Sequence, residues 1–375
     1  MTVRVLHVHA GNLYGGVETS LVTLARHAAA APEVEHRFAL CFDGRLAAEL
    51  RDAGASVDLV GATRISRPWT VLRARRRLRE QLSQGEIGVA VCHSAWSRAV
   101  FGPVIRAARV PLALWLHGAP GPRWLERWAR RSRPDLVLCN SRYTASTAPS
   151  LVPPVAAEVV HPLVSGCAVP RADRDARRAS LGVPRDTSVV VQVSRMEPSK
   201  GHTVLLDALA ELKHRHDWAC WIVGGAQRHG EVAYQQALHR RATALGIGER
   251  VHFLGERTDV PAILAAADVF CQPNTGPDAF GITFVEAMYQ GLPVIGSRLG
   301  ATPEIVNESC GVLVEPGSVR SLAQALADLL DHPERRAALG ANGPHRAREL
   351  CDPPAQVRRL AALLGDLART GRQVA

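Results

Sequence analysis

Two carboxylates, Asp278 and Glu286, are spaced eight residues apart around the start of an expected helix. The segment 271–291 predicts the end of an apolar strand, a turn-rich loop and then a helix that begins near Ile282. The first N–H groups of a helix lack intrahelical partners and favour an anion, and Gly281 lets the backbone approach a ligand closely. Glu286 lies among apolar neighbours, where a carboxylate needs a hydrogen-bonding partner. The pattern suits a nucleotide-sugar, whose phosphates would meet the N–H groups and whose hydroxyls would meet the carboxylates.

Two cations, Arg195 and Lys200, follow an apolar strand expected over residues 188–193 and precede a second helix. The 45 Lys and Arg residues of the chain include only two lysines, Lys200 and Lys213. Because a helix N-terminus disfavours a cation, a lysine at this place indicates a functional role. A guanidinium fork beside an ammonium suits a diphosphate, and we prefer this interpretation to a solvated basic loop.

Further candidates lie at the ends of strands expected nearer the N-terminus. Residues 3–9 predict a strand, and Gly15 and Gly16 follow it before a helix, an arrangement that places backbone N–H groups against a phosphate. Gly-Gly also forms ordinary tight turns, and the lack of G-x-G-x-x-G argues against a dinucleotide site. His117 ends a strand expected over residues 111–118, where a parallel sheet presents functional groups.

Two histidines, His7 and His9, share one face of the first strand. No third ligand stands nearby in the sequence, so two satisfied core histidines are favoured over a metal site.

Strand and helix patterns alternate through both halves of the sequence, which predicts βαβ units and parallel sheets with ligands at the carboxyl ends of the strands. In the second half, two strands end close to Gly225 and Gly255, near where a nucleotide would lie. Prolines, glycines and a charge run between residues 161 and 184 predict a linker, so we place the domain boundary near residue 166.

The composition excludes several classes of protein. No apolar run reaches the roughly eighteen residues of a transmembrane helix, and the first residues predict a strand in place of a signal peptide. The eight cysteines are scattered without C-x-x-C pairs, which favours reduced thiols over a zinc site. The net charge of +10 comes from dispersed arginines without a reader motif, so we expect no nucleic acid as partner. These features predict a cytoplasmic protein.

Two basic segments carry aromatic residues or arginine runs. The first is a helix near residues 71–82, and the second, near residues 123–133, holds Trp124, Leu125 and Trp128 among arginines. Such segments could make peripheral contact with the inner face of an anionic membrane. We favour ordinary amphipathic helices, whose tryptophans cover the sheet and whose arginines are solvated.

The segment from Asp278 to Glu286 resembles the E-x7-E motif of the retaining GT-B glycosyltransferases of glycosyltransferase family 4. The similarity extends to FGITFVEAMYQGLPVI and GATPEIV, to the R-x4-K-G element at Arg195, to a G-G-x-E segment at Gly15 and to the His-Gly strand end at His117. Asp in the first place of the motif departs from the family pattern and reaches about one methylene less far, which affects the choice of donor sugar.

The resemblance implies an α/β GT-B fold, in which two Rossmann-like domains with parallel sheets face a central cleft. It implies an acceptor-side domain over residues 1–166, with a C-terminal helix at 355–375 packing back on it, and a nucleotide-sugar domain over residues 167–354. The catalytic residues that it implies are His117, Arg195, Lys200 and Asp278. The donor-binding residues that it implies are Gly15, Gly16, Arg195, Lys200, Gly225, Gly255, Asp278, Phe280, Gly281, Ile282, Thr283 and Glu286.

By this resemblance we expect a metal-independent transferase that moves a sugar, with retention, from a nucleoside-diphosphate sugar to an acceptor hydroxyl. The acceptor is a lipid, a polysaccharide or a small natural product. No cofactor is expected beyond the donor, with UDP as the first choice of carrier and GDP as the second. Two alternatives are a nucleotide-sugar epimerase and a catalytically silent nucleotide-sugar-binding scaffold.

Overall fold

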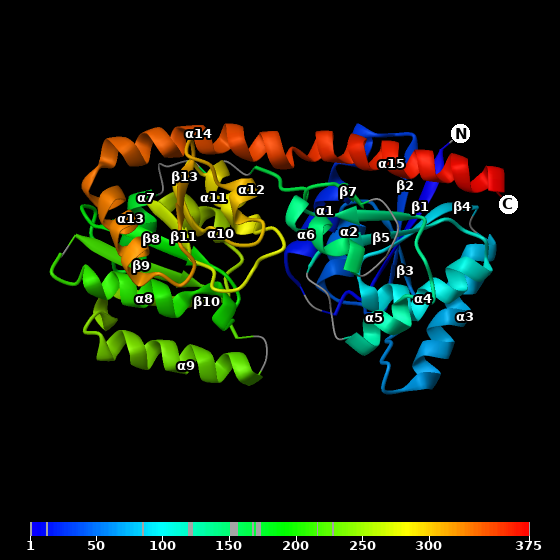
Figure 1. Cartoon of the computed structure of the whole chain (residues 1–375), viewed down its shortest axis with the longest axis horizontal. Coiled ribbons are helices and arrows are strands. Elements are labelled where there is room, and N and C mark those ends of the chain that lie inside the picture. The colour runs from blue at the N-terminus through cyan, green and yellow to red at the C-terminus, as the bar shows by residue number, and fades with distance from the viewer. Residues whose placement is uncertain are drawn as a thin grey trace. The chain divides into compact units, whose positions relative to one another are not determined.

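The computed structural model describes residues 2–12, 14–84, 86–118, 123–150, 157–166, 169, 174–215, 217–226 and 229–374. The chain divides into two compact units, one of Met1–Ser165 with Cys351–Ala375 and one of Gly166–Leu350 (Figure 1). The division therefore falls one residue before the predicted boundary, and the C-terminal part of the first unit begins at Cys351, four residues earlier than expected.

The first unit contains a parallel sheet of seven described strands in the order β3-β2-β1-β4-β5-β6-β7. Its strands are β1 (Val3–His9), β2 (Val34–Leu40), β3 (Ser56–Leu59), β4 (Ile87–Cys92), β5 (Leu112–Leu116), β6 (Leu136–Cys139) and β7 (Ala157–Val159). Its helices are α1 (Gly16–Arg26), η1 (Ala28–Ala30), α2 (Arg45–Asp52), α3 (Pro68–Gln84), α4 (Ala95–Ala107), α5 (Arg123–Ala129), α6 (Arg142–Thr147), η2 (Ala148–Ser150) and α15 (Pro353–Val374).

Alternation along the strands of this sheet builds two cores. Leu6 and Val8 point to the side covered by α3 and α4. Val5 points to the opposite side, where apolar residues of α1, α2 and α15 pack. Figure 1 shows α15 on the side of the sheet away from α3 and α4. The C-terminal helix is thus a structural part of the first unit.

The second unit contains a parallel sheet of six described strands in the order β10-β9-β8-β11-β12-β13. Its strands are β8 (Ser188–Val193), β9 (Trp218–Val223), β10 (Val251–Gly255), β11 (Val269–Gln272), β12 (Val294–Ser297) and β13 (Gly311–Val314). Its helices are α7 (Arg174–Ser180), η4 (Pro198–Lys200), α8 (His202–Glu211), α9 (His229–Ala244), η5 (Gly248–Arg250), α10 (Val260–Ala266), α11 (Ile282–Tyr289), α12 (Thr302–Ile305), α13 (Val319–Asp331) and α14 (Pro333–Cys351), of which α14 reaches the boundary with the first unit.

The strands β8 and β11 are neighbours in this sheet, so the loops that follow them lie side by side at its carboxyl edge. The loop after β8 carries the predicted site residues Arg195 and Lys200, and the loop after β11 carries the predicted site residue Asp278.

Among the described residues, no helix combines the length and the apolar character needed to cross a membrane. The seven cysteines within the described ranges are buried and free.

Candidate functional site

A close approach of backbone at Gly201 and two backbone hydrogen bonds join the loop after β8 to the loop after β11. Gly201 has a φ of 74°, and a Cβ at this position would lie 1.8 Å from the carbonyl oxygen of Pro273. The backbone N–H groups of Thr275 and Gly276 both donate to the carbonyl oxygen of Ser199, at 2.9 and 3.2 Å. The two loops therefore form one unit of backbone, which positions the side chains that they carry.

We expect Gly201→Ala to destabilise the protein far more than Gly246→Ala. Gly246 has a φ of 73° and open space around its Cβ position, so its replacement exposes only the backbone strain, about 1–2 kcal/mol. Gly201→Ala adds the clash with Pro273 and should cost about 3 kcal/mol more, or prevent folding. Urea denaturation of both variants measures the difference, and equal losses would show that the two loops separate easily.

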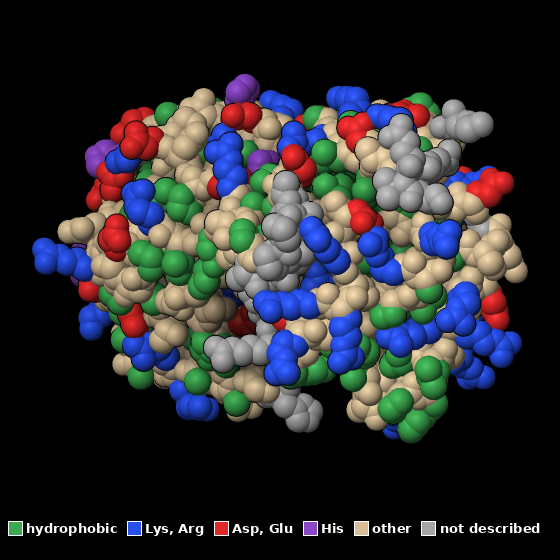
Figure 2. Space-filling view, turned by 45° about the vertical axis from the view of Figure 1, so that its right-hand side comes forward, with side chains coloured by type: hydrophobic (Ala, Val, Ile, Leu, Met, Phe, Trp, Pro, Cys, Tyr) green, Lys and Arg blue, Asp and Glu red, His purple; other side chains and the backbone are tan. Residues whose placement is uncertain are grey.

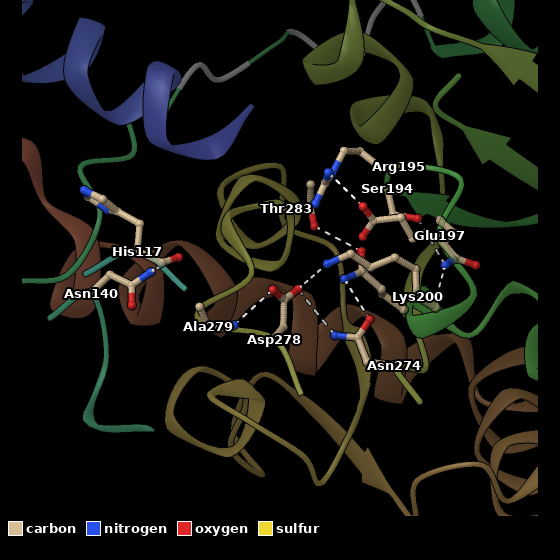
Figure 3. Close-up of polar contacts among 12 residues, drawn as sticks. His117, Asn140, Ser194, Arg195, Glu197, Lys200, Asn274, Asp278, Ala279 and Thr283 are labelled. Carbon is tan, nitrogen blue, oxygen red and sulfur yellow. Dashed lines mark hydrogen bonds and ion pairs between the residues drawn. The ribbon is translucent and has the colours of Figure 1, made fainter. Parts of the chain in front are cut away.

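The loop after β8 and the loop after β11 meet in an ion pair between Lys200 and Asp278. The Lys200 Nζ lies 2.6 Å from the Asp278 Oδ2, and the two side chains are only 16% and 21% exposed. The Asn274 Nδ2 donates to the same oxygen at 3.5 Å, and the Ala279 N–H donates to Oδ1 at 3.1 Å. Figure 3 shows Lys200 and Asn274 approaching Asp278 together. The sequence indicated both charged residues but not that they contact one another.

The backbone around these side chains is also held. The carbonyl oxygen of Lys200 accepts from the Gln192 Nε2 at 2.8 Å. The Asp278 carbonyl accepts from the Ala301 N–H at 3.0 Å, and a Cβ at Gly300 would lie 2.6 Å from the Asp278 backbone. The GATPEIV segment, which begins with Gly300 and Ala301, therefore packs against the backbone of Asp278. These contacts fix the position of the acid in the site.

Arg195, the second predicted cation, pairs with a different carboxylate and not with Asp278. Its Nη1 is 2.8 Å from the Glu197 Oε1, and its side chain is 45% exposed. Figure 3 shows this pair on the same loop as Lys200. Arg195 and Lys200 thus each have a carboxylate partner, and a diphosphate would have to compete with both carboxylates.

The helix α11 begins at Ile282, as predicted, with Gly281 as its N-cap at a φ of 111°. As a glycine, this N-cap residue supplies no side-chain hydrogen bond to the end of the helix. The Thr283 hydroxyl donates to the Gln272 Oε1 at 3.3 Å. Phe280 is 2% exposed, so its ring belongs to the interior and its predicted contact with the donor is restricted to the backbone.

Glu286 lies in the middle of α11, and its carboxyl group has no hydrogen-bonding partner within the described part of the chain. The Glu286 side chain is partly exposed, but protein atoms surround its carboxyl group. This burial raises the pKa of Glu286 to about 7. An acid in this state is poorly satisfied without a ligand. It is therefore the strongest candidate in the unit for contact with ligand hydroxyls.

The predicted glycines of β9 and β10 lie at neighbouring strand ends. The N–H of Gly224, beside Gly225, donates to the Gly255 carbonyl oxygen at 2.9 Å. A Cβ on Gly224 would lie 1.9 Å from the Ser194 carbonyl oxygen. Gly224 therefore lets the loops after β8 and β9 approach each other closely, and its N–H joins them to the end of β10.

In the first unit, Gly15 is the N-cap of α1 and Gly16 is its first residue. The Glu18 Oε1 lies 2.8 Å from the His9 Nε2, so the G-G-x-E segment is tied to the end of β1. His117 directly follows β5, and its carbonyl oxygen accepts from the Asn140 Nδ2 at 3.3 Å (Figure 3). Burial lowers the pKa of His117 to about 3, so this imidazole is neutral at physiological pH.

The sequence missed two histidines that contact the predicted ones. His93 joins its Nδ1 to the His117 Nε2 at 3.0 Å, and its Nε2 to the His7 Nδ1 at 2.9 Å. The His7 Nε2 in turn lies 2.9 Å from the His36 Nδ1. Strand alternation could have indicated His93, because His93 and His117 each directly follow a buried strand and their side chains lie on the same face of the sheet. The described residues contain no group of three or more His, Cys, Asp or Glu arranged to hold a metal ion.

A cavity of about 890 Å³ opens in the first unit beyond the ends of β1, β2 and β4. Its lining includes two arginines, Arg45 and Arg64, one acid, Asp43, and the aromatic residues Tyr14, Phe42 and Trp96. The Arg45 guanidinium lies 3.8 Å from the centre of the Tyr14 ring. Polar and charged groups beside aromatic walls suit a polyol.

Two protein families match this chain. "Glycosyltransferase Family 4" matches residues 14–165, within the first unit, and "Glycosyl transferases group 1" matches residues 173–346, within the second. The solved structure of HepE from Anabaena, in complex with UDP and glucose, is similar with a TM-score of 0.85 and 25% identity, over 97% of this chain and 99% of that one. This likeness confirms the predicted GT-B fold.

Curated relatives are similar over shorter stretches. The GDP-mannose-dependent alpha-(1-6)-phosphatidylinositol monomannoside mannosyltransferase of Mycolicibacterium smegmatis is 37% identical over 61% of this chain and 62% of its own length. The lipopolysaccharide core biosynthesis mannosyltransferase LpsB of Rhizobium meliloti is 29% identical over 63% and 67%. The chain thus spans about three fifths of the first of these relatives. With both units matched and the fold shared along nearly the whole chain, the protein belongs to the group 1 and family 4 glycosyltransferases.

Proposed function

We propose that this chain transfers a hexose from a nucleoside-diphosphate sugar to an acceptor hydroxyl, with retention of the anomeric configuration. The observation that carries the proposal is the loop pair of the second unit. It holds Lys200 against Asp278, and the carboxyl group of Glu286 is desolvated and has no partner among the described residues. An ammonium suits a diphosphate, and the two carboxylates suit sugar and ribose hydroxyls.

Donor binding would change the partner of Lys200. In the structure, Lys200 and Asp278 satisfy each other at 2.6 Å. A diphosphate brings more negative charge than one carboxylate, so the ammonium would turn to it and the Asp278 oxygens would accept from sugar hydroxyls. The N-terminus of α11, whose N-cap is Gly281, would face the same negative charge. In this proposal the protein supplies the positive charge itself, and unchanged rates in EDTA would support it.

The transfer itself would occur on one face of the sugar. The bond from the anomeric carbon to the β-phosphate oxygen breaks, the acceptor oxygen bonds to that carbon from the same side, and the acceptor proton passes to the departing phosphate. Lys200 would stabilise the charge that develops on the diphosphate. Asp278, engaged with the sugar hydroxyls, would orient the ring and would not form a covalent intermediate.

Incubation with donor, with and without an acceptor, tests the proposal. Two curated relatives are named GDP-mannose-dependent, whereas HepE was solved with UDP and glucose, so GDP-mannose is the first donor to test and UDP-glucose the second. Transfer that needs an acceptor supports the proposal. Conversion of the donor to an isomer without acceptor would indicate an epimerase, and binding without turnover would indicate a scaffold. The anomeric coupling constant of the product reports retention or inversion.

We further propose that the acceptor is the head group of an anionic lipid. Trp69 and Leu72 at the start of α3 are each 66% exposed, and Trp124 on α5 is 56% exposed. The same helices carry the exposed arginines Arg73, Arg76, Arg77, Arg79 and Arg127. Figure 2 shows apolar side chains with Lys and Arg side chains close above them at the lower right, over α3. Exposed aromatic residues among cations favour the surface of an anionic membrane.

The helices α3 and α5 belong to one surface because both pack on α4. Arg75 of α3 donates to the Val100 carbonyl oxygen of α4 at 2.6 Å, and its guanidinium lies 6.0 Å from the centre of the Trp128 ring of α5. Trp128 therefore packs against α4, whereas Trp124 remains exposed, so the expectation that both tryptophans cover the sheet is wrong for Trp124. Arg64, just before α3, also lines the 890 Å³ cavity.

Vesicle cosedimentation tests the lipid part of the proposal. The double variant Trp69→Ser and Leu72→Ser should bind vesicles containing phosphatidylglycerol about tenfold more weakly than the unchanged protein, since it loses the exposed apolar contact. Val232→Ser is the matched control, because Val232 is 46% exposed in the second unit. Binding should also fall with added salt, as expected for arginines facing anionic lipid. Equal binding by the double variant and the control would contradict the membrane surface.

A further inference from the structure

Four histidines form a continuous hydrogen-bonded row across the first unit. His36 lies on β2, His7 on β1, His93 directly after β4 and His117 directly after β5, and these four strands are adjacent in the sheet. Strand alternation brings the four side chains to the same face. The N···N distances between successive rings are 2.9, 2.9 and 3.0 Å.

The rings are rigidly held and uncharged. His7 is fully buried, His93 is 2% exposed and His36 is 7% exposed. The His117 ring stacks on His93 and on Trp115, with centroid distances of 5.2 and 5.1 Å. Desolvation lowers the pKa of His36 to about 4 and that of His7 and His93 well below the ordinary value.

Neutrality couples the protons of all four rings. A neutral imidazole has one N–H donor and one bare acceptor nitrogen, and both nitrogens of His7 and His93 are engaged within the row. All three hydrogen bonds must therefore run in one direction. If His36 donates to His7, the row ends with an N–H at the His117 Nδ1. If His117 donates to His93, the row ends with an N–H at the His36 Nε2.

The inner end of the row decides between these two directions. The His36 Nε2 is buried and has no hydrogen-bonding partner within the described part of the chain. An N–H at that atom would be an orphaned buried donor, which folded proteins avoid more strictly than a bare acceptor. The row is therefore expected to place the proton of His36 on Nδ1, so that each ring donates toward His117.

We propose that the row holds His117 as the Nδ1–H tautomer, so that its outer nitrogen presents a hydrogen-bond donor to a ligand oxygen and does not act as a general base. His36, His7 and His93 are positioning residues that act through this tautomer. The assignment of the tautomer stands without the proposed function. That the ligand oxygen belongs to a sugar or an acceptor rests on the proposed function.

Nitrogen-15 spectra of histidine-labelled protein, recorded without substrate at pH 7.5, test the tautomer directly. Two-bond correlations between ring nitrogens and carbon-bound protons distinguish an N–H nitrogen from a bare one, and the loss of signals in His117→Asn assigns the ring. We expect the Nδ1–H form of His117 to exceed the Nε2–H form by about tenfold or more. A dominant Nε2–H form would overturn the proposal.

Two substitutions test whether the row sets this tautomer. His36→Leu leaves the buried His7 Nε2 as the inner end, where an N–H would again be an orphaned donor, so the Nδ1–H form of His117 should stay in excess, by a smaller factor because the donation from His36 is lost. His93→Leu removes the donor that faces the His117 Nε2 and should abolish the excess. His202, which bonds to Ser194 in the second unit, should give unchanged signals in both variants.

A merely structural role would move the unfolding temperature of both variants without changing the tautomer, and that result would overturn the coupling. An inactive protein that shows the expected tautomer would contradict the proposed function and leave the tautomer assignment intact.

Discussion

Replacement of Lys200 by alanine should lower the transfer rate by about 10²–10³-fold, because it removes the cation that we assign to the leaving diphosphate. The Lys200 ammonium is mostly buried and lies 2.6 Å from Asp278, in a site where charge is weakly screened by water. The measurement is kcat/KM for the nucleotide-sugar donor by product analysis, with the unfolding temperature as a check of folding.

The matched control is Lys213→Ala, which replaces the other lysine of the chain at an exposed position. It should leave both rate and stability unchanged. A normal rate in Lys200→Ala would refute the assignment of the diphosphate to Lys200.

The ion pair offers a second, purely structural explanation that a double variant separates. Lys200→Ala leaves the Asp278 carboxylate without its ammonium, and an uncompensated charge in a partly buried site is itself destabilising. If Lys200 served only to pair with Asp278, adding Asp278→Asn to Lys200→Ala would restore both the unfolding temperature and the affinity for a free nucleoside diphosphate, which lacks the sugar that we assign to Asp278. We expect the unfolding temperature to recover and the affinity for the diphosphate to stay low, since the cation is needed for the leaving group.

Replacement of Glu286 by glutamine should weaken donor binding by about tenfold to a hundredfold at pH 8, where the carboxylate is ionised and can accept strong hydrogen bonds. Since burial raises the pKa of Glu286 to about 7, this form becomes scarce at pH 6. Donor affinity of the unchanged protein should therefore rise between pH 6 and pH 8, and that of Glu286→Gln should not. Calorimetric titration with a nucleotide-sugar measures both, because its phosphates are esterified and do not titrate in this range.

The same variant should be more stable than the unchanged protein above pH 7. The folded pKa of Glu286 is raised from 4.5 to about 7, so between these values the folded state holds a proton that the unfolded state releases. The free energy of unfolding therefore falls as the pH rises through this window. Glutamine removes that loss, about 3 kcal/mol at pH 8. Glu211→Gln, at an exposed site on α8, is the control and should change neither property. Lower stability of Glu286→Gln at pH 8 would show that the carboxylate has a structural partner.

Much of the fold follows from local patterns in the sequence. The apolar strand before Arg195 and the glycine-flanked start of α11 depend on residues within one or two turns of each other, so their types predict the elements directly. The position of Lys200 at a helix start is also a local property, and it predicts a ligand site from the sequence alone. The GT-B fold itself was implied by the resemblance of the motifs to a known family.

The pairing of residues from different strands could not be predicted in this way. Lys200 and Asp278 are 78 residues apart, and they meet because β8 and β11 are neighbours and Gly201 admits the Pro273 carbonyl. The exposure of Trp124 beside a covered Trp128 depends on where α4 lies, which helical periodicity alone does not show.

The sequence by itself determined which residues carry charge, which strands are buried and which loops contain the candidate site, because these depend on residue type and local spacing. Only the tertiary structure decided that Asp278 neutralises Lys200, that Glu286 has no described partner and that four histidines share one row of protons. The physical reason is that strand order and register, set by the packing of whole sheets, choose the neighbours of each side chain, and a neighbour sets its charge and its tautomer.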